Sequence, residues 1–313
     1  MGRYTIQRLL AMVPVLVVVA IVTFSLIHIT PGDPVALMAG DEATPEQKEA
    51  IRKDMGLDKP IYQQLVIYFA DILRGDLGES IFNKFKVTTL ISQRLEPTLF
   101  IAVFSQLVSI VIAIPLGILA AWKANTWVDR VVMVIAVLGL AIPSFWLGAN
   151  LIWVFAVKLH WFPAFGYIPI SEGIVPWIKS ITLPSISVGF ISAALIARMT
   201  RASMLEVLRE DYVRTARAKG LSEQAVLLGH AFKNASIPVV TIIGIGIAGL
   251  VSGLVVTEAV FGIPGVGRLI VDAVNRRDYP VIQGVILMFT VAYVLINLVV
   301  DLIYGYLDPR IRY

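Results

Sequence analysis

The 313-residue sequence contains no cysteine and only three histidines. The absence of cysteine excludes disulfides and thiolate metal sites. His28, His160 and His230 lie in three separate segments, so we interpret each as a polar residue at the edge of an apolar segment rather than as a metal ligand. Charged residues are also scarce, at 15%, and the net charge of +4 is small and dispersed. This charge distribution does not favour binding to nucleic acid.

Apolar residues are abundant instead, at 58% of the chain, which is too apolar for a soluble globule and predicts a protein made mostly of membrane spans. Long apolar runs are separated by short polar segments, and each run has the length of a bilayer crossing. We therefore predict six transmembrane helices, at residues 9–29, 98–122, 131–157, 181–200, 239–257 and 283–304.

The basic residues at the ends of these runs predict their orientation. Arg3 and Arg8 precede the first run, whose roughly twenty residues exceed a signal-peptide core, so we expect an uncleaved anchor with a cytoplasmic N-terminus. Lys123 and Arg130 place the next inner loop in the cytoplasm by the positive-inside rule, and the basic tail 307–313 does the same for the C-terminus.

Residues 31–96 are polar and, in this orientation, form an extracytoplasmic subdomain. We expect a short helix that begins at Thr44-Pro45-Glu46 and stops before Pro60. A second helix over Tyr62–Leu73 has helical periodicity but too many polar residues to span a membrane.

The longest polar interval in the second half of the chain is 206–238. We expect a short helix from Asp211, acting as its cap, to Lys219, then a left-handed C-terminal cap at Gly220 and a second helix beginning at the N-cap Ser222. On charge alone, the segment would be a solvated loop with the usual cytoplasmic positive charge. Charge alone does not explain the order of the capping residues.

The local phrase DYVRTARAKGLS, followed by Ile237-Pro238, resembles the EAA loop of binding-protein-dependent ABC transporter permeases. Arg214 replaces the first Glu of that loop, and Phe232-Lys233 stands where the general pattern has Leu-Pro. Further phrases extend the resemblance over nearly the whole chain, specifically to the dipeptide/oligopeptide branch and its B-type subunit: GLDKPIYQQ, TEAVFGIPGVGR, RRDYP and DLIYGYLDPRIR.

The resemblance implies an all-α integral membrane fold with six transmembrane helices, built as a type I ABC importer (MetI-like) core with an extracytoplasmic subdomain between spans 1 and 2. The expected division is an N-terminal transmembrane helix at 1–30, the subdomain at 31–96, a five-helix core at 97–306 with the coupling loop 206–238, and a cytoplasmic tail at 307–313. It further implies a bacterial or archaeal inner-membrane location.

In this family the chain is a transport subunit rather than an enzyme, so no cofactor is expected in it, and ATP and Mg belong to a partner ATPase. The resemblance implies a homologous second permease, one or two cytoplasmic ATPase subunits and an extracytoplasmic substrate-binding protein. The residues it assigns to ATPase coupling are Asp211, Tyr212, Arg214, Thr215, Ala216, Arg217, Lys219, Gly220 and Ser222.

The fifth span is rich in glycine, and Gly246, Gly249 and Gly253 are the candidate residues lining the translocation path. The ordinary consequence of such spacing is close helix packing. That the span borders the path is implied by the resemblance.

Several features of the outer loops have two interpretations. Trp161, Phe162, Tyr167 and Trp177 form either an interfacial aromatic belt or a contact surface for a binding protein. Glu258 pairs with Arg268 or Arg276, or faces a polar substrate. The run 262–268 (GIPGVGR) is no phosphate loop, because the Lys and Ser or Thr that such a loop needs are replaced by Arg-Leu.

The substrate predicted from the resemblance is a dipeptide or oligopeptide, and nickel chelates, glutathione and oligosaccharides are the alternatives. Other classes of protein stay open. A proton-coupled carrier would need a carboxylate or histidine buried in the middle of a span, and no predicted span has an Asp, Glu, Lys or Arg there. An intramembrane enzyme would need a nucleophile and base, or a pair of aspartates, at bilayer depth, and these are missing too. The residues alone do not exclude a membrane scaffold.

Overall fold

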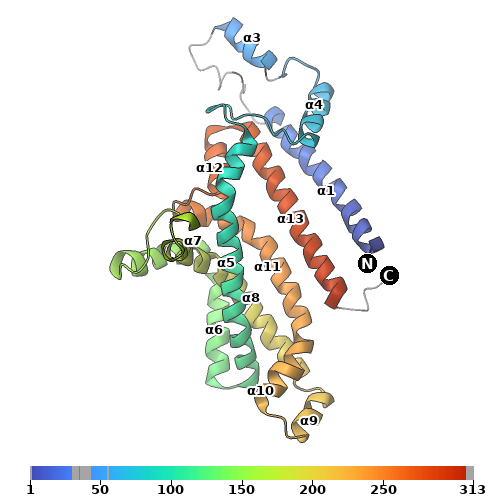
Figure 1. The fold of residues 1–313 in the computed structure, drawn as a ribbon, viewed down its shortest axis with the longest axis vertical. Helices are drawn as coiled ribbons and strands as arrows, with labels where there is room; N and C mark the ends of the chain where they lie inside the picture. Colours follow the sequence, from blue (N-terminus) through green and yellow to red (C-terminus); the bar gives the residue numbers. More distant parts are fainter. Residues whose placement is uncertain (1, 30–34, 36–43, 55, 308–313) are drawn as a thin grey trace. The chain divides into compact units, whose positions relative to one another are not determined.

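The computed structural model describes residues 2–29, 35, 44–54 and 56–307, and these are mostly helical (Figure 1). The helices are α1 (Gly2–Ile29), α3 (Pro45–Asp54), α4 (Ile61–Leu73), α5 (Val87–Trp122), α6 (Trp127–Ala141), α7 (Ser144–Leu151), η1 (Ile152–Lys158), η2 (Ile170–Glu172), α8 (Ile174–Val207), α9 (Asp211–Ala218), α10 (Glu223–Ala225), η3 (Val226–Ala231), α11 (Phe232–Val260), α12 (Val266–Arg276) and α13 (Tyr279–Leu307). They form two compact units. One comprises 96–268 and the chain from 296 onward, and the other comprises 2–95 and 269–295.

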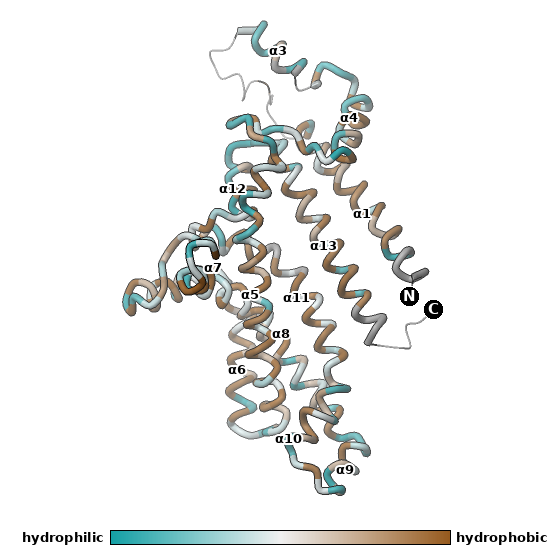
Figure 2. Tube along the Cα trace, in the orientation of Figure 1, coloured by the Kyte–Doolittle hydropathy of each residue, from teal (hydrophilic) through white to brown (hydrophobic). Residues whose placement is uncertain are grey.

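Five helices of the described chain are long and apolar enough to cross a membrane, and a bent pair brings the number to six if it counts as one span. Figure 2 shows apolar residues along most of their length, whereas α3 and much of α9 are polar. The predicted spans are present, but the helices extend beyond the predicted limits. The second begins at Val87 rather than near residue 98, and the fourth covers Ile174–Val207 rather than 181–200.

The third predicted span, 131–157, is not one straight helix. It consists of two helical parts, which are α6 and the continuous segment formed by α7 and η1. The chain bends by 107° between these two parts. Ile142 has an extended backbone (ψ 122°) at the break, as expected for a residue that precedes a proline. At 1.5 Å per residue, the 15-residue α6 is only about 22 Å long, shorter than a hydrocarbon core of about 30 Å.

Helix α8 is the centre of the first unit. Two thirds of its most apolar window (67%) is buried within the chain, compared with 17–28% for the other spans, and it packs against α6, α7 and α11 (Figure 1). Small residues let α5 approach it closely: a Cβ added at Gly189 would lie 2.7 Å from the carbonyl oxygen of Ser105. An ion pair joins α6 to α8, with Arg201 donating to both carboxylate oxygens of the buried Asp129 at 2.5 and 2.7 Å.

The second unit contains the two polar helices predicted between the first two spans. Helix α3 begins at Pro45, directly after Thr44. The Thr44 hydroxyl accepts from the amide of Gln47 (3.3 Å), and the Gln47 side chain accepts from the Thr44 amide (2.9 Å). Helix α4 packs on α1, and the Tyr68 hydroxyl lies 3.0 Å from that of Thr23. The buried carboxylate of Asp278 accepts from Ser80 Oγ at 2.5 Å and from the Ile81 amide at 3.1 Å.

One helix was missed. The segment 258–280 was expected to be a loop, but Val266–Arg276 forms the amphipathic helix α12. Buried Val266, Leu269 and Ala273 are spaced for one helical face. The glycines in 262–267, at and before the start of α12, resemble a loop motif. For this reason the helical pattern was not recognised in the sequence.

Candidate coupling site and translocation path

Helix α9 carries most of the residues assigned to ATPase coupling, and it is held by a small apolar cluster. Val213 and Ala216 are buried against Val226 of η3, with Val207 and Leu208 at the end of α8 packed beside them. Val213 and Ala216 are three positions apart, so they share one face of the helix. The Tyr212 hydroxyl also accepts a hydrogen bond from Asn234 Nδ2 of α11 at 2.7 Å. Helix α9 is therefore fixed to both α8 and the η3–α11 helix.

The turn after α9 has the predicted capping residues. Gly220 has a φ of +78°, the left-handed conformation that glycine adopts without strain. Ser222 caps the next helix, and its hydroxyl accepts from the Ala225 amide at 3.4 Å. Arg217 binds both carboxylate oxygens of Glu223 at 2.9 and 3.4 Å and so bridges the turn. The second helix continues through η3 into α11 as one long element.

The prediction for Asp211 was wrong in one respect. Asp211 is the first residue of α9 and Glu210 occupies the N-cap position, without a side-chain capping hydrogen bond. An Asp in the first turn still stabilises a helix through its dipole, and here its carboxylate lies 3.3 Å from Arg214 Nη1. The outward face of α9 and its turn is exposed: Asp211, Arg214, Thr215, Lys219, Gly220 and Ser222.

The three candidate path glycines lie on one face of α11, since they are spaced by three and four residues. A Cβ added at Gly253 would lie 3.4 Å from Val188 of α8, which is an ordinary contact. At Gly246 the nearest atom would be Ser192 Oγ at 3.5 Å, and at Gly249 the described residues offer no atom within 4 Å. This face of α11 therefore approaches α8 without the tight packing seen at Gly189.

Glu258 is fully buried at the far end of α11 and is bound by protein groups. Thr98 Oγ1 donates to its carboxylate at 2.6 Å, and the amide of Arg268 donates at 2.9 Å. Thr98 Oγ1 in turn accepts from the amide of Val266 at 2.9 Å. Of the two earlier interpretations, the geometry favours the structural one, with Arg268 contacting Glu258 through its backbone amide.

The glycines of 262–267 are explained by the same carboxylate. A Cβ added at Gly265 would lie 2.2 Å from the Glu258 carboxylate carbon, and one at Gly267 would lie 2.9 Å from its oxygen. The loop wraps a buried carboxylate, so its likeness to a phosphate loop has a structural cause.

The aromatic residues in the segment between η1 and α8 and in the first turn of α8 pack mainly inward. Trp177 stacks edge-on against Phe100 with centroids 5.0 Å apart, and Phe162 packs edge-on against Phe155 at 6.4 Å. The Tyr167 hydroxyl donates to Glu96 at 2.8 Å. Burial, together with this hydrogen bond, raises the pKa of Tyr167 to about 12. Trp161 is 55% exposed, so a belt or contact surface would consist of fewer residues than the sequence suggested.

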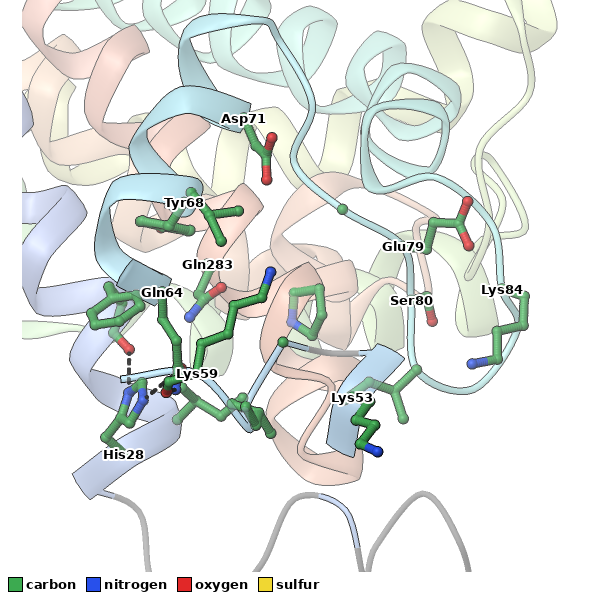
Figure 3. A pocket seen from close by; sticks show the side chains of 18 residues that line it. His28, Lys53, Lys59, Gln64, Tyr68, Asp71, Glu79, Ser80, Lys84 and Gln283 are labelled. Carbon is green, nitrogen blue, oxygen red and sulfur yellow. Dashed lines mark hydrogen bonds between the residues drawn. The ribbon is translucent and has the colours of Figure 1, made fainter. Parts of the chain in front are cut away.

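The second unit contains a polar pocket of about 510 Å³ that the sequence did not reveal. Lys53, Lys59 and Lys84 line it together with Asp71 and Glu79 (Figure 3). On its rim, His28 Nε2 lies 3.1 Å from Gln64 Oε1 and Nδ1 lies 3.3 Å from the Phe24 carbonyl oxygen. Burial raises the pKa of Tyr68, which also lines this pocket. Among the described residues, no group of three or more His, Cys, Asp or Glu has the arrangement of a metal site.

Comparisons with known proteins cover the whole chain. Residues 113–313 match the family described as binding-protein-dependent transport system inner membrane component, and residues 1–102 match the N-terminal region of such membrane components. A probable peptide ABC transporter permease protein of Sinorhizobium fredii is 45% identical over all of both chains. The dipeptide transport system permease protein DppB of Alkalihalophilus pseudofirmus is 42% identical, and the glutathione transport system permease protein GsiC of Escherichia coli 45%, each over full length.

Among solved structures, two crystal forms of the inward-facing MetNI methionine ABC transporter share the fold. The first has a TM-score of 0.57 and 18% identity over 70% of this chain and 96% of that one, and the second a TM-score of 0.58 and 19% identity over 71% and 97%. This likeness supports a type I importer core. With the match to residues 113–313 and full-length relatives at 42–45% identity, the chain belongs to the family of binding-protein-dependent transport system inner membrane components.

Proposed function

We propose that this chain is one permease subunit of an ATP-driven importer and forms half of the translocation path for short peptides. The names of its relatives support peptides as the substrate class, because they are a probable peptide permease, a dipeptide permease and a glutathione permease. Glutathione is itself a tripeptide. The permease would work with a homologous second permease, one or two ATPase subunits that bind ATP and Mg, and an extracytoplasmic binding protein.

The basic residues at the helix ends support an orientation with both termini in the cytoplasm. Arg8 lies near the start of α1, Lys123 and Arg130 flank the α5–α6 turn, and Arg201 lies near the end of α8. In this orientation α9 faces the cytoplasm and residues 31–96 lie outside. We retain the division into an anchor at 1–30, a subdomain at 31–96, a core at 97–306 and a tail at 307–313. The lysine-lined pocket gives the subdomain a polar surface for contact with the binding protein.

The observation that carries the proposal is the attachment of α9 to two spans at once. Its buried face contacts the end of α8 and the η3 turn, and Tyr212 contacts α11. A force on the exposed face, from Asp211 to Ser222, would therefore move α8 and α11 together. Closure of the ATPases would supply this force and switch the path between inward- and outward-facing arrangements. The glycine face of α11, at Gly246, Gly249 and Gly253, would border that path.

The test is uptake by proteoliposomes that contain the complete transporter, with ATP hydrolysis measured in parallel. Reversing the charges of Arg217 and Lys219, or replacing Gly220 by proline, is expected to leave hydrolysis active while uptake is lost. The Arg217–Glu223 ion pair complicates the charge reversal because the variant also breaks an internal contact. The exchange Arg217→Glu with Glu223→Arg is the matched control, since it restores the internal pair while reversing the charge presented at position 217.

The outcomes separate the alternatives. If the exchange behaves like Arg217→Glu, the surface charge matters for coupling, and if it behaves like wild type, only the internal pair does. Wild-type uptake in all of these variants would refute a coupling role for α9. A mild-detergent pull-down that recovers the chain without a second permease and a P-loop ATPase would favour the carrier and scaffold interpretations.

A further inference from the structure

Gln106, in the middle of α5, is a buried side chain without a hydrogen-bonding partner. It is only 7% exposed, and neither its amide nitrogen nor its carbonyl oxygen has a partner in the part of the chain that the structure describes. A carboxamide carries two donors and one acceptor, so burying it unpaired is costly, and more so at membrane depth, where water is scarce. Such a group is rare in native proteins and needs an explanation.

Some buried hydroxyls on the same helices do have partners, although the hydroxyl of Ser105, the residue before Gln106, has none among the described residues. Ser109, one turn further along α5, donates to the Ser105 carbonyl oxygen at 2.7 Å and lies 2.6 Å from the Gly189 carbonyl oxygen. Thr200 of α8 donates to the Ile196 carbonyl oxygen at 2.7 Å. These hydroxyls are satisfied by the helix backbone, as is usual in membrane helices. The side chain of Gln106 has no equivalent partner.

Gln106 points toward the glycine face of α11. Its Oε1 lies 3.8 Å from the position that a Cβ would occupy at Gly246, and Ser192 Oγ of α8 lies 3.5 Å from the same point. Because residue 246 is glycine, no side chain covers the Gln106 carboxamide from this side. Gly246 itself is half-buried.

The polar groups continue along the same pair of helices. The contacts of Gly246 with Ser192 and of Gly253 with Val188 show that α8 and α11 run antiparallel. Ser185 lies seven residues before Ser192, on the same face of α8. The hydroxyls of Ser185 and Thr257 are buried and also lack a hydrogen-bond partner among the described residues. The seam between α8 and α11 thus holds several unsatisfied polar groups.

We propose that the Gln106 carboxamide forms hydrogen bonds with a peptide group of the transported substrate as it passes Gly246. A peptide group offers one N–H donor and one C=O acceptor, which match the acceptor and donors of a carboxamide. Because residue 246 is glycine, a main chain could approach the carboxamide on this side once the helices move apart, and Ser192 supplies a further hydroxyl. The contact forms when α8 and α11 separate, and it offsets the cost of the unpaired amide. This inference rests on the proposed function, since it assumes a peptide substrate.

The contact is tested by measuring uptake with the complete transporter in proteoliposomes. The binding protein is kept saturated with substrate. The probes are trialanine and the trialanine analogue that is N-methylated at one peptide bond, which lacks that N–H donor. Wild type is expected to transport the analogue about tenfold less efficiently than trialanine, the loss that corresponds to about 1.4 kcal/mol of hydrogen bonding. Gln106→Leu is expected to transport trialanine about tenfold less efficiently and to lose the discrimination between the two.

Thermal stability separates this role from a structural one. Because the amide is unpaired, Gln106→Leu is expected to unfold at the same temperature as wild type or higher, whereas a structural amide would lower it. Ser109→Ala is the matched control on the same helix: it removes a satisfied hydroxyl, so stability falls while discrimination stays as in wild type.

Each remaining outcome has a defined meaning. Equal discrimination in wild type and Gln106→Leu would overturn the role of Gln106 while leaving the proposed function intact. If wild type transports none of dialanine, trialanine and glutathione, the peptide substrate is wrong, and the inference fails with it. Failure of Gln106→Leu to assemble with the second permease would assign the amide to the interface between subunits and also overturn the inference.

Discussion

Replacing Val213 by alanine is expected to release α9 from the ends of α8 and η3 without unfolding the spans. Val213 is fully buried, and with Ala216 and Val226 it forms the buried part of a small cluster. The change removes two carbon groups, each worth about 0.8 kcal/mol when buried. With the cavity that is left, the loss is about 2 kcal/mol.

This loss predicts a specific change in hydrogen exchange. If α9 opens locally, a loss of about 2 kcal/mol multiplies the open population roughly thirtyfold, because a factor of ten corresponds to about 1.4 kcal/mol. The backbone amides of Val213, Arg214 and Lys219, which donate to the carbonyl oxygens of Glu210 and Thr215, are expected to exchange about thirtyfold faster. Amides in the centre of α8 are expected to be unchanged, and uptake per ATP hydrolysed is expected to fall.

Thr215→Ala is the matched control within α9. Thr215 is exposed, and its hydroxyl donates only to the Asp211 carbonyl oxygen one turn earlier at 2.9 Å, so exchange in α9 should increase by less than about threefold. Equal exchange in Val213→Ala and wild type would refute the reasoning that this cluster holds α9. Faster exchange throughout α8 as well would show that α9 does not open as a separate unit.

Three further predictions concern stability. Arg201→Met leaves the buried Asp129 carboxylate unpaired, so unfolding free energy should fall by about 3 kcal/mol, and adding Asp129→Asn should recover most of it; a double variant as unstable as Arg201→Met would contradict this. Gly265→Ala should lower the melting temperature sharply because its Cβ would collide with Glu258, and much less in a Glu258→Ala background; equal losses in both backgrounds would disprove the collision. The pKa of Tyr167 is raised to about 12 in the folded protein, so the neutral phenol stabilises the fold. This stabilisation is complete below the unfolded pKa of about 10 and is lost as pH rises toward 12. Stability of Tyr167→Phe should therefore fall less steeply than wild type over that range, and parallel curves would show that Tyr167 does not contribute.

Much of the fold could be predicted because its signals are local. Apolar length located the spans, the start signal Thr44-Pro45-Glu46 located α3, and Gly220 and Ser222 located the turn after α9. Each of these depends on a few residues close in the sequence, so no tertiary contact was needed to recognise it.

The features that escaped prediction depend on contacts between distant residues. Pro143 lies within the third predicted span, but the 107° bend beside it depends on how α7 packs. The role of the 262–267 glycines required the position of Glu258, and its partner Thr98 lies 160 residues away in sequence. Gln106 looks like any isolated polar residue in an apolar run. Only the absence of a partner among the described residues distinguishes it.

The coupling segment and the proposed substrate contact involve the same two long helices. Helix α9 is held by the end of α8 and, through Tyr212, by α11. Ser192 of α8 and Gly246 of α11 are the residues that lie over Gln106. A displacement of α9 that separates α8 from α11 would therefore uncover Gln106 beside Gly246 at the same time. This connection explains why an unsatisfied amide is tolerated there: its hydrogen bonds would form only in the arrangement in which a peptide can reach it, so the unpaired state favours opening toward the substrate.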